Sequence, residues 1–81
     1  MLKYRLQVQQ EVMDLASKIS PRVQVEIFRV FQGAYERHRD QHGSLACVAH
    51  SSEYGIKMKE RIDFMKQEAL NYLASVDSKP S

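Results

Sequence analysis

The sequence predicts an all-α fold, a small bundle of three helices in a single domain. Two features of the 81 residues indicate this class. Turn-forming residues are concentrated near residue 20 and between residues 42 and 52, and the three segments that they separate are rich in good helix formers. Within each segment, apolar residues recur every three or four positions, which is the period of an amphipathic helix. We expect one domain over residues 1–76 and a flexible polar tail over residues 77–81.

The first segment, from about Leu2 to Ile19, predicts a helix with a wide apolar arc. At about 100° per residue, its apolar side chains form two adjoining stripes, one of Tyr4, Val8, Val12, Leu15 and Ile19 and one of Leu2, Leu6 and Met13. Together the stripes cover about half of the circumference, which is more than a typical surface helix buries. We therefore expect this helix to contact two neighbours.

The second segment carries clear start and stop signals for a helix. Ser20 is suited to capping the free amides, and Pro21 is suited to the first helical position. Gly43 favours the left-handed conformation that commonly ends a helix. The expected buried face consists of Val23, Ile27, Val30, Phe31, Ala34 and His38.

A short apolar run, Leu45–Ala49, lies between the second and third segments. We expect it to form a helical turn tucked against the core. Ser51 or Ser52 follows it and is expected to cap the third helix.

The third segment carries two sets of apolar residues. The first set follows the heptad rhythm of a coiled-coil seam and is predicted to form a dimer interface: Met58, Ile62, Met65, Ala69 and Tyr72. The second set lies outside this seam and is predicted to bind a partner protein: Ile56, Phe64, Leu70 and Ala74. Exposed apolar patches on small soluble proteins often mark contacts, and so short a chain encloses only a small core. We expect a homodimer, another protein partner, or both.

All three histidines and the only cysteine fall within thirteen residues, in the pattern His-x3-His-x4-Cys-x2-His: His38, His42, Cys47 and His50. Imidazole and thiolate bind zinc, so a zinc-stabilised helical domain is one alternative. Each residue also has an ordinary structural role. His38 lies on an apolar helix face, His42 lies near the negative end of a helix dipole, and Cys47 lies in an apolar run. We prefer these roles and expect no cofactor.

No catalytic set is evident in the sequence. Cys47 could pair with His42 or His50, but an activated cysteine needs an electropositive, accessible setting, and its neighbours are Ala46 and Val48. The three glycines are scattered and form no phosphate-binding loop. Acidic residues lie among lysines and arginines, which indicates solvated charge networks. We therefore expect no enzymatic activity.

Residues 15–22 resemble the bend of a helix-turn-helix, so a DNA-binding transcriptional regulator is a second alternative. Two positions depart from that motif: Ser20 stands where a turn glycine is usual, and Glu26 falls on a position that is normally buried. The formal net charge is only +2, and arginines alternate with acidic residues, so no basic stripe results. Nucleic-acid binding is therefore not expected.

A single cysteine cannot form an internal disulfide, the first residues lack the apolar run of a signal peptide, and no stretch is long enough to cross a bilayer. A cytoplasmic protein is expected. Surplus apolar helix surface without a catalytic set predicts a small regulatory or adaptor protein that binds other proteins. A phage-type or mobile-element-type inhibitor of a larger enzyme or transcription factor fits this profile.

Overall fold

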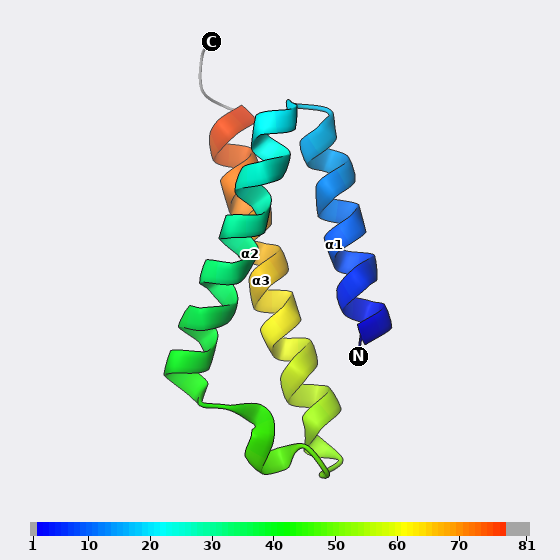
Figure 1. Ribbon diagram of the computed structural model, residues 1–81, viewed down its shortest axis with the longest axis vertical. Coiled ribbons are helices and arrows are strands. Elements are labelled where there is room, and N and C mark those ends of the chain that lie inside the picture. The colour runs from blue at the N-terminus through cyan, green and yellow to red at the C-terminus, as the bar shows by residue number, and fades with distance from the viewer. Residues whose placement is uncertain (1, 78–81) are drawn as a thin grey trace.

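The computed structural model describes residues 2–77 as three helices and one short 3-10 turn (Figure 1). The helices are α1 (Leu2–Ser17), α2 (Pro21–His42) and α3 (Glu53–Asp77), and the 3-10 turn η1 (Leu45–Val48) lies between α2 and α3. The predicted all-α class, with three helices and a helical turn between the second and third, is therefore confirmed. Residues 78–81 of the expected tail lie outside the described part of the chain.

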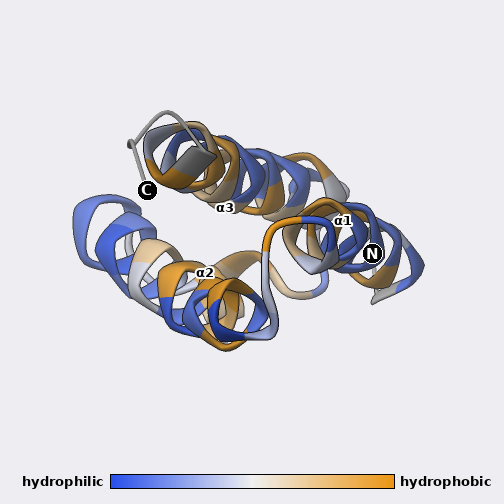
Figure 2. Cartoon of the chain, turned by 90° about the horizontal axis from the view of Figure 1, so that it is seen from above, coloured by the Kyte–Doolittle hydropathy of each residue, from blue (hydrophilic) through white to orange (hydrophobic). Residues whose placement is uncertain are grey.

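The three helices differ in length, and this divides the molecule into two halves. α1 has 16 residues, whereas α2 has 22 and α3 has 25. α2 and α3 extend well below α1 in Figure 1, and the view from above shows the helices at the corners of a triangle (Figure 2). We call residues 2–35 and 63–77 the three-helix half. The hairpin half, residues 36–62, contains only the end of α2, η1 and the start of α3.

The boundaries of α2 follow the capping signals in the sequence. Ser20 Oγ accepts a hydrogen bond from the Val23 amide at 3.3 Å, and Pro21 is the first helical residue. Gly43 ends the helix with a φ of 84°, a conformation that favours glycine, and its amide donates to the Arg39 carbonyl. The predicted start and stop of this helix are confirmed.

The cap of α3 agrees with the prediction, whereas the end of α1 differs from it. Ser51, rather than Ser52, provides the cap before α3, because its Oγ accepts from the Glu53 amide at 3.1 Å. α1 ends at Ser17, two residues earlier than the predicted end at Ile19.

The apolar core lies where the three helices meet. Its buried members are Val12, Ala16, Val23, Ile27, Phe31, Ala34, Met65, Ala69 and Leu73. The predicted buried face of α2 is confirmed, with Val30 only partly buried.

The packed face of α1 differs from the predicted stripe. Val8 and Val12 are buried as expected, but the next buried residue is Ala16, while Leu15 and Ile19 remain 43% and 36% exposed. Residues at intervals of four therefore define the face that packs, and the small side chain of Ala16 lies against the core. α1 contacts both α2 and α3, as its wide apolar arc predicted.

The seam on α3 packs within one chain. Ile62, Met65 and Ala69 are buried in the single protomer, and Met58 and Tyr72 are partly buried. These residues were predicted to form a dimer interface, because a heptad rhythm is shared by coiled coils and by helices of a bundle. The three buried side chains present no surface to a second copy in this arrangement. Dimerisation of the chain stays a prediction.

Candidate functional site

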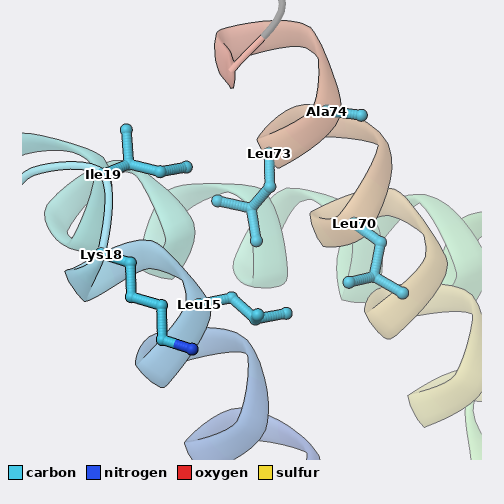
Figure 3. Close-up of a pocket in the computed structure, with 6 residues that line it drawn as sticks. All are labelled: Leu15, Lys18, Ile19, Leu70, Leu73 and Ala74. Atoms are coloured by element: carbon cyan, nitrogen blue, oxygen red, sulfur yellow. The ribbon is translucent and has the colours of Figure 1, made fainter.

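A groove between α1 and α3 contains two of the four residues predicted to bind a partner. Its volume is about 310 Å³, and its lining consists of Leu15, Lys18, Ile19, Leu70, Leu73 and Ala74. Figure 3 shows Leu15 from α1 and Leu70 and Leu73 from α3 extending toward the space between the two helices. We call this feature the α1–α3 groove. Because every lining side chain except Lys18 is apolar, water in it is readily displaced by an apolar side chain of another molecule.

The other two predicted partner-binding residues lie elsewhere. Ile56 is 64% exposed near the start of α3, and it is fourteen positions from Leu70, which corresponds to about 21 Å along a helix. Phe64 is half-buried, with its ring centroid 5.3 Å from that of His38. The structure therefore brings Leu70 and Ala74 into one groove, and it separates Ile56 and Phe64 from them.

Most of the large exposed apolar side chains among the described residues belong to the three-helix half. Leu6, Leu15, Ile19, Val25 and Phe28 are all more than a third exposed, and Ile56 alone of this group lies on α3. A second groove, of about 570 Å³, lies between α1 and α2; three of its lining residues are apolar, Leu6, Met13 and Phe28, and the other three are glutamines. We call it the α1–α2 groove. α1 is thus flanked by apolar surface on both sides.

A buried arginine connects α2 to α3 in the hairpin half. Arg61 is only 1% exposed. Its Nε donates to His38 Nδ1 at 3.0 Å, and its Nη2 donates to the Gly43 carbonyl at 2.7 Å. The guanidinium also lies over the Tyr35 ring, 5.2 Å from the centroid. Arg61 therefore binds the C-terminal end of α2, where the helix dipole favours a positive charge.

The charge of Arg61 is held by neutral groups. A guanidinium remains protonated at every relevant pH, and no carboxylate among the described side chains, those of residues 3–76, forms an ion pair with it. A carbonyl, an imidazole and an aromatic face replace part of the lost hydration. Removing a charge from water without a counter-ion carries a large desolvation penalty. The Arg61 environment is thus electrostatically incomplete, in contrast to the apolar core of the other half.

His38 is neutral in this environment. Burial lowers the pKa of His38 below its usual value, and the neighbouring His42 and Arg61 lower it further, while Glu60 opposes them. The rings of His38 and His42 have centroids 4.2 Å apart, which accounts for the effect of His42 on the pKa of His38. Because Nδ1 accepts the hydrogen bond from Arg61, the neutral imidazole carries its proton on Nε2.

The four candidate zinc ligands do not come together. Within the described residues, no three His, Cys, Asp or Glu side chains are grouped so that they could hold a metal ion. His38 and His42 have the structural positions that the sequence suggested, the first buried with one hydrogen-bonded nitrogen and the second in the last turn of α2. In this arrangement His38, His42, Cys47 and His50 therefore do not form a zinc shell, and a zinc-stabilised domain stays an untested alternative.

The apolar run around η1 is less buried than predicted. Leu45 and Val48 are half-buried, but Cys47 is exposed, and its Sγ lies 3.6 Å from the Ser44 carbonyl. A 3-10 turn has three residues per turn, so positions 45 and 48 share one side and Cys47 faces away from it.

Two polar features of the structure were not identified from the sequence. Arg61 lies on the apolar arc of α3, three positions after Met58 and four before Met65, and a basic residue in that position was the available signal. The second feature connects α1 to α3: the Tyr4 hydroxyl and the Lys59 ammonium both donate to the Asp63 carboxylate. Both hydrogen bonds lower the pKa of Asp63, and the bond from Lys59 has the larger effect.

Comparison of the chain with protein families, with curated proteins and with solved structures found no match. Among residues 2–77, no helix has the length and apolar character needed to cross a bilayer.

Proposed function

We propose that this chain is a small non-enzymatic regulatory or adaptor protein, and that it binds another protein through the apolar surface beside α1. The observation that supports this proposal is the α1–α3 groove, in which Leu15, Ile19 and Leu70 form an apolar lining open to solvent. Small soluble proteins seldom leave such surface uncovered unless it serves a contact.

The groove favours an apolar helix as the binding element. A partner helix can place side chains spaced by three or four residues between α1 and α3, as in other helix-in-groove complexes. Lys18 at the edge offers a positive charge for an acidic residue of the partner. Recognition would thus combine apolar anchors with one ionic contact.

The strength of this contact is modest, because little exposed area remains to be covered. Fully burying a leucine or isoleucine contributes about 1.5–3 kcal/mol, and Leu15 and Ile19 are already more than half buried. Each therefore offers about 1 kcal/mol, which does not offset the entropy lost on association. A stable complex needs further anchors along α1, and Leu6, which lines the adjoining α1–α2 groove, supplies another.

The test is affinity capture from the cells that encode the chain, with wild type and two matched variants. Leu15→Glu places a charge in the α1–α3 groove, and Ile56→Glu places the same charge on the exposed side of the hairpin half. A partner bound as proposed is retained by wild type and by Ile56→Glu, and is lost with Leu15→Glu. Circular dichroism of each variant establishes that the fold is kept.

Two outcomes would contradict the proposal. In the first, Leu15→Glu retains the same proteins as wild type. In the second, wild type retains nothing above the level of an unrelated helical protein of similar size. Loss with Ile56→Glu alone would place the interface at the start of α3 and would also reject the groove.

Self-association is a separate part of the proposal and is measured by sedimentation equilibrium of the wild-type chain. The seam residues Ile62, Met65 and Ala69 are internal, so a dimer would use exposed apolar residues in their place. In that case Leu15→Glu weakens the dimer and Ile56→Glu does not.

A further inference from the structure

A much smaller cavity than either groove lies against Arg61 in the hairpin half. It has a volume of about 40 Å³, and its lining consists of His38 and His42 from α2, Leu45 from η1, and Lys57, Glu60 and Arg61 from α3. It differs from both grooves beside α1, because five of its six lining residues are polar or charged. We call it the Arg61 pocket.

The balance of charge in the Arg61 pocket is positive. Arg61 and Lys57 each contribute a full positive charge, and Glu60 contributes the only negative charge of the lining. Glu60 is exposed, and within the described chain it forms no ion pair with either cation at 4 Å or less. The buried guanidinium therefore lies beside a small cavity without a counter-ion in contact.

The hydrogen-bonding groups around the pocket are mainly donors. The described bonds of Arg61 use Nε and Nη2, so the guanidinium retains further N–H groups. His38 accepts at Nδ1 and carries its proton at Nε2, and the Lys57 ammonium is a donor only. A cavity whose lining carries a net positive charge and several hydrogen-bond donors is suited to an acceptor that carries negative charge.

We propose that the Arg61 pocket binds one small monovalent anion, either chloride or a single carboxylate group, with the Arg61 guanidinium as its principal contact. The volume admits a monatomic ion or the tip of a carboxylate, and it is too small for a nucleotide or a sugar phosphate. The anion supplies the counter-charge that the protein itself does not place on Arg61, and charge-assisted hydrogen bonds hold it. This inference does not depend on the partner surface beside α1.

Glu60 is the competing source of negative charge. Its carboxylate lines the same pocket and could rotate toward Arg61, which would make an external anion unnecessary. The two arrangements respond oppositely to Glu60→Gln. If an external anion binds, removing the Glu60 charge strengthens binding. If Glu60 itself fills the pocket, saturable anion binding is seen only after Glu60 is replaced.

The experiment is an NMR titration of the full ¹⁵N-labelled chain with sodium formate, and separately with sodium chloride. The pH is about 7.5, where histidines are mostly neutral, and a bulky sulfonate keeps the ionic strength constant. The Arg61 Nε–H signal and the ring signals of His38 and His42 are followed. Saturation with formate alone identifies a carboxylate site, and saturation with both identifies a general small-anion site; either outcome supports the proposal.

Matched variants separate a site from general screening by salt. Lys57→Gln removes one charge at the pocket and is expected to weaken binding about tenfold. Lys3→Gln removes the same charge from the exposed surface of α1 and should leave the affinity unchanged. Shifts that grow without saturation, equal effects of the two lysine variants, or saturation confined to Glu60→Gln would each overturn the proposal. Melting curves of each variant verify folding independently.

Discussion

The two halves of this molecule differ in what holds their helices together. In the three-helix half, α1, α2 and α3 enclose buried side chains that are all apolar, among them Val12, Ile27 and Ala69. In the hairpin half only two helices are present, and both buried polar residues of the described chain, His38 and Arg61, are found there. Two helices cannot surround an apolar interior on all sides. Hydrogen bonds from Arg61 on α3 to the C-terminal end of α2 therefore help to hold the two helices together.

The halves differ in their surfaces as well. α1 closes the three-helix half with a narrow packed face of Val8, Val12 and Ala16, which leaves Leu6 and Leu15 beside it exposed. The hairpin half has one large exposed apolar side chain, Ile56. The three-helix half therefore carries most of the large exposed apolar side chains, and the hairpin half carries a buried positive charge without a counter-ion in contact.

The largest effect is expected from cavity formation in the three-helix half. Ile27 is fully buried, so Ile27→Ala should lower the free energy of unfolding by about 2–5 kcal/mol. Val25→Ala on the same helix truncates an exposed side chain and should change it by less than about 0.5 kcal/mol. Urea denaturation measures both. Similar losses for the two variants would mean that the apolar interior is not where the structure places it.

In the hairpin half, the corresponding variant is Arg61→Met. It leaves the His38 Nδ1 and Gly43 carbonyl acceptors without their donor and should lower the free energy of unfolding by about 2–4 kcal/mol. Arg37→Met, which removes an exposed ion pair with Glu68, is the control and should cost less than about 1 kcal/mol. Equal values for the two arginines would show that the buried arginine does not hold this half together.

A double-mutant cycle sharpens that result. His38→Leu alone leaves Arg61 without one acceptor, whereas the combination with Arg61→Met removes both partners. The double variant should therefore be more stable than the sum of the single losses indicates. Additive losses would show that the two side chains do not interact.

The pH dependence of stability should also distinguish the halves. The pKa of His38 is lowered in the folded chain, so on acidification the unfolded chain binds a proton first. The contribution of His38 to stability is then constant well above about pH 6.5, the pKa of an unfolded histidine. It falls as the pH drops through that value and levels off once folded His38 is itself protonated. Urea denaturation from pH 8 to pH 5 measures this, and His38→Gln should remove the slope. A slope that persists in this variant would assign it to another group.

The smallest effect is expected at the junction of the halves, where Tyr4 donates to Asp63. Tyr4→Phe should lower the free energy of unfolding by less than about 1 kcal/mol, because the contact is only partly buried and Lys59 still donates to the carboxylate. It should also raise the pKa of Asp63 toward its ordinary value, since a donor to the carboxylate is lost while Lys59 remains. An NMR titration of the Asp63 carboxyl measures that shift. An unchanged pKa would mean that the Tyr4 bond is not formed in solution.

Those parts of the fold that depend on local chemistry were predictable from the sequence. Ser20, Pro21 and Gly43 set the limits of α2 through capping and backbone preference, which act within a few residues. Periodicity likewise identified the buried face of α2, because side chains four apart share a side whatever packs against them.

Features that depend on which helices meet were not predictable in the same way. The rhythm of Ile62, Met65 and Ala69 is the same for a seam between two chains and for one within a chain, so the dimer assignment had no basis in spacing alone. The length of α1 relative to the other helices decides which apolar residues are covered, and only the assembled bundle shows this. Arg61 was missed because its partners lie 18 and 23 residues away along the chain.

The most direct test of the proposed partner surface is calorimetric titration of wild type and of Leu15→Glu with the captured partner at several temperatures. If the groove beside α1 is covered by an apolar helix, binding has a clearly negative heat-capacity change, because apolar surface is removed from water. Leu15→Glu then weakens binding and makes that change smaller. A heat-capacity change near zero, or one that Leu15→Glu leaves as it is, would contradict the account.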